Sequence, residues 1–101
     1  MSYGLIINDE RVESFPVKHA GFWYLDYETV YACVSSKFFY DGMVLLYTDP
    51  LTTWSAVPGK AYYYDSNGGK YQTEYEPAFF SHGRLYISLD YIQLMDYSYF
   101  R

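Results

Sequence analysis

Two pairs of carboxylates are the residues of this chain that could carry out acid–base chemistry. Glu74 and Glu76 alternate along an expected strand, and Asp26 and Glu28 lie at the start of an expected helix. A glycoside hydrolase needs a placed acid together with a nucleophile or base, but neither pair forms such a constellation at a recognisable spacing. We therefore expect a solvated strand face and a helix cap at these positions, and we expect that the chain is not an enzyme.

Metal and thiol chemistry have equally little support in the sequence. His19 and His82 lie in similar expected turns, and neither has a second ligand at the spacing that a metal site needs. Cys33 is the only cysteine, so no intrachain disulfide can form. It lies in an apolar helix pattern, where a thiol is usually buried and inert. We expect two surface histidines, an unreactive cysteine, no metal and no cofactor.

The aromatic side chains are the best candidates for a binding function. The chain has 15 Tyr, 7 Phe and 2 Trp, and so many amphipathic rings cannot all be buried. Those on expected strands that we single out are Trp23, Trp54, Tyr62, Tyr64, Tyr71 and Tyr75. Core packing with cross-strand pairs explains most such rings. An exposed row of them would instead suit a protein interface or stacking on sugar rings.

Length and charge exclude several classes of protein. The 101 residues suit one domain. The net charge of -5, with seven scattered basic residues, argues against binding to nucleic acid, which requires a basic surface. No apolar run reaches the roughly 18 residues of a membrane span, so we expect no membrane insertion. Residues 1–4 lack the basic and apolar segments of a signal peptide.

The elements that would position these residues are organised around a phrase that occurs twice. Leu25-Asp26-Tyr27 and Leu89-Asp90-Tyr91 lie 64 residues apart (89 minus 25). Each follows an extended aromatic run and precedes a helical pattern. We expect Asp26 and Asp90 to be N-caps, whose carboxylates accept hydrogen bonds from the first helical turn. The expected buried stripes are Tyr27, Val30, Tyr31 and Val34 in the first helix, and Tyr91, Leu94 and Met95 in the second.

Short hairpins account for most of the remaining chain. The expected paired strands are residues 5–7 with 11–15, 37–40 with 43–48, and 61–64 with 71–75; further strands are expected at 22–25, 52–57, 78–81 and 85–89. Asp41-Gly42 and Pro58-Gly59 supply the turn chemistry. We predict an α+β fold in which antiparallel β-hairpins pack on two short α-helices.

The order of elements predicts two imperfect β-β-β-α repeats, at about 3–50 and 51–101, within a single module. Asp49-Pro50 is the expected seam between them. The first repeat continues into the Asp41-Gly42 hairpin, whereas residues 97–101 look extended and the sequence stops at Arg101. Either the domain ends differently there, or the second repeat is truncated at its C-terminal end.

This pattern resembles the copper-amine-oxidase N-terminal-like domain, also called the stalk domain. The likeness rests on Pro16, on the run from Gly21 through Leu25-Asp26-Tyr27, and on residues 83–92. Residues 37–50 are most similar to the version that precedes family-eighteen glycoside hydrolase domains in clostridial and Lachnospiraceae-type bacteria. The Asp-x-x-Asp-x-Asp-x-Glu signature of those hydrolases is absent from the sequence.

The resemblance implies a non-catalytic accessory or spacer domain of a secreted or cell-surface bacterial protein, without copper. Its partners would be a neighbouring hydrolase domain of a longer chain and a glycan such as peptidoglycan, and its location would be extracellular or at the cell surface. The alternative is a freestanding acidic, Tyr-rich protein-interaction domain of the inhibitor type. That function would require carboxylates gathered on one face, whereas the sequence spreads them.

Overall fold

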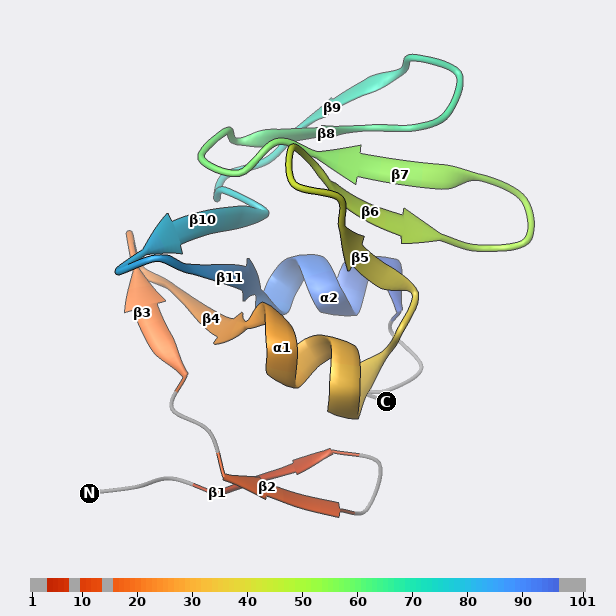
Figure 1. The fold of residues 1–101 in the computed structure, drawn as a ribbon. Coiled ribbons are helices and arrows are strands. Elements are labelled where there is room, and N and C mark those ends of the chain that lie inside the picture. Colours follow the sequence, from red (N-terminus) through yellow and green to blue (C-terminus); the bar gives the residue numbers. More distant parts are fainter. Residues whose placement is uncertain (1–3, 8–9, 14–15, 97–101) are drawn as a thin grey trace.

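A computed structural model describes residues 4–7, 10–13 and 16–96 (Figure 1). A two-stranded sheet consists of β1 (Gly4–Ile7) and β2 (Glu10–Glu13). A four-stranded sheet, in the order β10-β11-β4-β3, consists of β3 (Val17–His19), β4 (Phe22–Asp26), β10 (Ala78–Ser81) and β11 (Arg84–Ser88). A five-stranded sheet consists of β5 (Phe38–Tyr40), β6 (Leu45–Thr48), β7 (Thr53–Ala56), β8 (Tyr62–Tyr64) and β9 (Lys70–Gln72) in sequence order. The helical segments are α1 (Tyr27–Thr29), its π-helical continuation η1 (Val30–Val34), and α2 (Leu89–Met95).

The four-stranded sheet is made of two hairpins that pair through their second strands. Leu25 of β4 lies opposite Ile87 of β11 in an antiparallel register. The hairpin turns are Ala20-Gly21, with φ of 52° and 88°, and His82-Gly83, with φ of 52° and 76°. Positive φ at both central residues is the type I′ geometry, whose twist matches that of the flanking strands. The sequence predicted both turns, but it did not predict strand β3.

Two hairpin–helix segments, β3–β4–α1 and β10–β11–α2, have the same order of elements. They match at an offset of 62 residues, not 64. Gly21 and Gly83 hold the same place in their turns (83 minus 21). Asp26 and Ser88 are the last residues of β4 and β11 (88 minus 26). The two Leu-Asp-Tyr phrases therefore do not occupy equivalent positions, and the prediction that both mark the same junction is wrong.

The helix caps also differ from the prediction. Asp26 is the N-cap residue of α1, but its carboxylate accepts no capping hydrogen bond. At α2 the N-cap is Ser88, whose Oγ accepts from the backbone N–H groups of Asp90 and Tyr91 at 3.1 and 3.3 Å. Asp90 lies in the first turn of α2 instead. Strand pairing fixes β11 through Ser88, and a serine hydroxyl caps a helix as well as a carboxylate does.

The helix that follows β4 is wound more loosely than an α-helix. The Ser35 N–H donates to the carbonyl of Val30 at 2.9 Å, an i to i+5 hydrogen bond that ends η1. Val30 and Val34 are buried as predicted, whereas Tyr31 is 45% exposed. In α2 the buried residues are Tyr91 and Ile92, and Leu94, which we expected to be buried, is half exposed.

The five-stranded sheet is a meander in which the turns at Asp41-Gly42 and Pro58-Gly59 were predicted correctly. The Asp41 carboxylate accepts from the N–H groups of Met43 and Val44, which closes the turn after β5. Gly59 has φ of 87°, and the Lys60 N–H donates to the carbonyl of Val57, as a type II turn requires. The sheet runs across the expected seam, because β6 pairs directly with β7.

One core joins the two larger sheets and the helical segments. Its buried members come from β4, η1, α2 and both larger sheets: Leu25, Val30, Val34, Phe38, Leu45, Tyr47, Ala56, Ala78, Leu85, Ile87, Tyr91 and Ile92. The structure thus confirms a small domain of two short helices and many antiparallel strands, with strands predominating. Residues 97–101, expected to be extended, lie outside the described residues.

Candidate functional site

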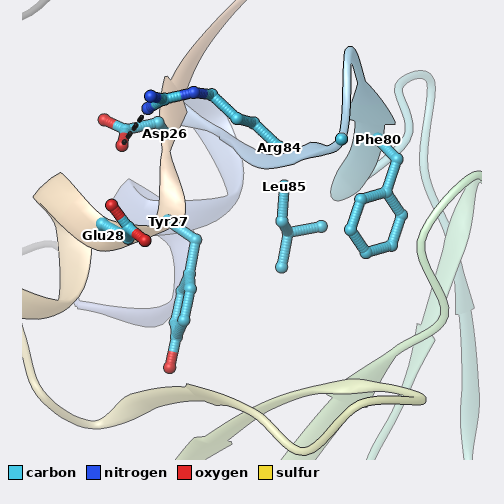
Figure 2. A pocket seen from close by; sticks show the side chains of 7 residues that line it. Asp26, Tyr27, Glu28, Phe80, Arg84 and Leu85 are labelled. Carbon is cyan, nitrogen blue, oxygen red and sulfur yellow. Dashed lines mark ion pairs between the residues drawn. The ribbon is translucent and has the colours of Figure 1, made fainter.

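A pocket of about 390 Å³ lies between the start of α1 and the β10–β11 hairpin (Figure 2). Its lining comes from the end of β4, the first residues of α1, strand β10, and the turn and strand that follow it. The lining residues are Asp26, Tyr27, Glu28, Phe80, Gly83, Arg84 and Leu85. Pairing of β4 with β11 brings these two distant parts of the chain together.

The charged side of the pocket carries two carboxylates and one guanidinium. Nη1 of Arg84 lies 3.9 Å from Oδ2 of Asp26, which is an ion pair but too long for a hydrogen bond (Figure 2). The Arg84 side chain is 65% exposed and that of Asp26 only 17%. Glu28 is exposed and makes no hydrogen bond or ion pair to another described residue. The sequence pattern singled out Asp26 and Glu28 but not Arg84, because only the pairing of β4 with β11 places Arg84 beside them.

The apolar side of the pocket is held in place by Tyr40 of β5. The Tyr40 N–H donates to the Tyr27 hydroxyl at 3.1 Å. The Tyr40 ring meets the half-exposed Phe80 edge-on, with ring centroids 5.5 Å apart. Buried Leu85 is the most enclosed of the lining residues. The pocket therefore has fixed apolar walls beside an ionic rim.

The predicted aromatic residues do not form one surface. Trp23 projects half-exposed from β4, with Nζ of Lys18 5.7 Å from its ring. Tyr75 packs against Phe22 and the core. The remaining four lie on the five-stranded sheet, where they divide between its two faces.

Trp54 and Tyr71 belong to the core-facing side of that sheet. Both rings contact Tyr63, which stacks on Tyr71 at 5.1 Å and meets the buried Tyr91 at 5.5 Å. The Trp54 Nε1–H donates to Asp49 at 3.3 Å. Burial raises the pKa of Tyr63. Trp54 and Tyr63 pack against the core, whereas Tyr71, on the same face, is 41% exposed.

Tyr62 and Tyr64 point to the opposite face of the sheet. Successive strand residues alternate between faces, and Tyr63 between them faces the core. Their rings meet edge-on at 5.4 Å, and Nζ of Lys70 lies 4.1 Å from the centroid of Tyr62. Tyr62 and Tyr64 are partly exposed on this face, whereas Trp23 and Tyr71 of the predicted set are more exposed, at 49% and 41%.

A continuous row of side chains crosses all five strands on this outer face. The strand register places Phe39 opposite Leu46, Leu46 opposite Ser55, Ser55 opposite Tyr64 and Tyr64 opposite Lys70. Phe39 is 50% exposed, while its neighbour Phe38 is fully buried. We call Phe39, Leu46, Ser55, Tyr62, Tyr64 and Lys70 the outer aromatic face. Figure 1 shows β8 and β9 at the end of the sheet farthest from the helices.

His19 is not the surface turn residue that the sequence predicted. It is half-buried at the end of β3, its ring stacks on Phe79 at 4.0 Å, and its Nε2 lies 3.0 Å from the Glu76 carboxylate. The Tyr24 hydroxyl donates to the backbone carbonyl of Glu76 at 2.6 Å. Burial raises the pKa of Tyr24 to about 12, and the nearby Glu76 carboxylate acts in the same direction. This cluster ties the chain after β9 to the four-stranded sheet.

The other expected chemistry is not assembled in the described part of the chain. Glu76 is engaged by His19, and Glu74 is exposed. Cys33 is partly exposed in η1, not fully buried. Among the described residues, no group of three or more His, Cys, Asp or Glu side chains could hold a metal ion. Within the same residues, neither helix has the length and apolar character needed to cross a bilayer.

Comparisons of the chain with models of protein families, with curated proteins and with solved structures gave no match. The resemblance to stalk domains therefore remains a prediction.

Proposed function

We propose that this chain is a non-catalytic accessory or spacer domain of a secreted or cell-surface bacterial protein, and that it binds glycan through the outer aromatic face. The observation that carries the binding part is the row across the five-stranded sheet. Phe39, Tyr64 and Lys70 lie in this row, and Tyr62 lies beside it on the same face. Aromatic rings on a sheet offer flat apolar surface with polar edges, which suits the faces and hydroxyl groups of sugar rings.

The accessory role is supported by the resemblance and by the sparse catalytic chemistry. The pocket carries the carboxylates of Asp26 and Glu28, and Arg84 already neutralises Asp26 in part. An imperfect internal repeat fits the same proposal. Its units would be the β3–β4 and β10–β11 hairpins, each with the helix that follows it, at an offset of 62 residues (83 minus 21). The repeat would supply a rigid spacer, because both units share one core.

Calorimetric titration with chitin oligomers and soluble peptidoglycan fragments tests the glycan part. We expect measurable affinity, lowered about two- to twelve-fold by Tyr62→Ala or Tyr64→Ala, since an aromatic contact contributes about 0.5–1.5 kcal/mol. Tyr31→Ala is the matched control, because Tyr31 is an exposed tyrosine of η1, away from this face. Affinity no better than millimolar for every oligomer would remove the glycan function.

The native reading frame on both sides of the chain tests the accessory part. A catalytic domain encoded beside residues 1–101 would support the proposal. A gene that encodes these residues alone would favour the freestanding interaction domain instead.

A further inference from the structure

We propose that the pocket between α1 and the β10–β11 hairpin binds an alkyl-ammonium or alkyl-guanidinium group, as carried by a lysine or arginine side chain. This inference is independent of the proposed function, because it concerns a different site. It rests on the cavity, on its mixed lining and on the charge that the protein itself already places at the rim.

The rim has the charge that a cation requires. Asp26 and Glu28 contribute two carboxylates against the single guanidinium of Arg84. Glu28 has no hydrogen bond or ion pair to another described residue, so its charge is available to a ligand. The whole chain carries a net charge of -5, which also favours the approach of cations.

The walls suit the hydrocarbon part of such a ligand. Tyr27 and Phe80 present aromatic rings, and Leu85 adds an apolar side chain (Figure 2). A cation beside an aromatic face is attracted by the ring quadrupole, and its alkyl stem can pack on apolar surface. The contacts of Tyr40 with Tyr27 and Phe80 hold these walls in place before any ligand arrives.

Arg84 shows that the rim accepts a guanidinium. Its Nη1 lies 3.9 Å from the Asp26 carboxylate, beyond hydrogen-bond distance, and its side chain is 65% exposed. A loosely held, exposed arginine can move away when a better-placed cation enters. Arg84 is therefore an internal competitor for the ligand, and its removal should strengthen binding.

NMR titration of the whole chain tests the proposal. The probes are capped arginine and capped lysine (N-acetyl, methylamide), butylguanidinium, and capped citrulline as the neutral control. We expect amide shifts at residues 26–28 and 80–85 with the three cations and none with citrulline. Equal affinity of butylguanidinium and capped arginine would mean that the cationic group alone is recognised, whereas tighter binding of capped arginine would indicate a peptide source.

Two variants with matched controls decide the roles of the charges. Glu28→Gln should weaken binding by up to about five-fold, the upper end for an exposed ion pair. Glu74→Gln, at an exposed position outside the pocket, should leave binding unchanged. Arg84→Gln should strengthen binding by a similar factor. Lys60→Gln is the control, because it changes the net charge of the chain equally, and it should strengthen binding less. The proposal would be overturned if Arg84→Gln bound the cations more weakly than the wild type. It would also be overturned if capped citrulline bound as tightly as capped arginine, or if no cation shifted the amides.

Discussion

Leu25 of β4 and Ile87 of β11 lie directly opposite each other, and their side chains are 1% and 0% exposed. This pair joins the two hairpin–helix segments at the centre of the four-stranded sheet. It packs in the same core as η1, α2 and the five-stranded sheet. The stability of the whole domain should therefore depend on it.

Leu25→Ala and Ile87→Ala should each lower the free energy of unfolding by about 2–5 kcal/mol, because each leaves a cavity in a close-packed core. The double variant should not show the simple sum, since the two residues are cross-strand neighbours in one core. Urea denaturation measures all three. Leu94→Ala is the control, because Leu94 is half exposed in α2 and should change stability by no more than about 0.5 kcal/mol. Equal costs at Leu25 and Leu94 would contradict the assignment of the core.

Ser88→Ala should destabilise the protein by about 1 kcal/mol, because the Ser88 hydroxyl satisfies two N–H groups at the start of α2. Asp90→Ala should cost less, since its carboxylate acts through the helix dipole. Thermal unfolding of the two variants gives the comparison. A larger loss in Asp90→Ala than in Ser88→Ala would show that the aspartate is the cap after all.

Acid should loosen the turns of the five-stranded sheet. The carboxylates of Asp41 and Asp49 accept backbone N–H bonds, and that of Asp65 accepts the Tyr71 hydroxyl and backbone N–H bonds. These bonds hold the pKa of each carboxyl below its ordinary value of 3.8 in the folded protein. The stabilisation is complete above the unfolded pKa and is lost as the pH falls through the lowered folded values.

The triple variant Asp41→Asn, Asp49→Asn, Asp65→Asn should therefore lose less melting temperature than the wild type as the pH falls from about 5 to about 2. An asparagine oxygen keeps the acceptor of each turn but cannot be protonated in this range. Glu74→Gln serves as the comparison, as an exposed carboxylate outside these turns. An unchanged pH profile in the triple variant would rule out these turns as the origin of acid sensitivity.

Alkali should act through the partly buried tyrosines. Burial raises the pKa of Tyr75 from 10.0 to about 12. The neutral phenol is therefore favoured in the folded state. The resulting stability is present below pH 10.0 and is lost as the pH rises toward about 12. Tyr75→Phe should flatten the loss of melting temperature across this window, and Tyr31→Phe, at an exposed position, should not. Identical alkaline profiles for both variants would contradict this assignment.

Local chemistry explains what the sequence predicted well. Asp41-Gly42 and Pro58-Gly59 determine their turns through side-chain hydrogen bonds and positive φ, both of which depend on neighbouring residues. The helix start after β11 was misplaced by two residues. Both Ser88 and Asp90 are capping types, and the pairing of β11 with β4, which is not local, decides between them.

The candidate sites were less predictable, because they too depend on pairing and packing between distant parts of the chain. Alternation along β8 indicated that Tyr62 and Tyr64 share a face, but only the core contact of Tyr63 with Tyr91 shows which face is outside. The pocket was not predicted at all, because the contact of Asp26 with Arg84 arises from pairing between distant strands.

NMR mapping of a peptidoglycan fragment or chitin oligomer on the isotope-labelled chain shows directly whether the outer aromatic face binds glycan. We expect amides of β7, β8 and β9 to shift on titration, with the largest changes around Tyr62, Tyr64 and Lys70. Tyr64→Ala should reduce these shifts at equal ligand concentration. Shifts confined to other surfaces, or no shifts at millimolar ligand, would contradict the claim that the outer aromatic face binds glycan.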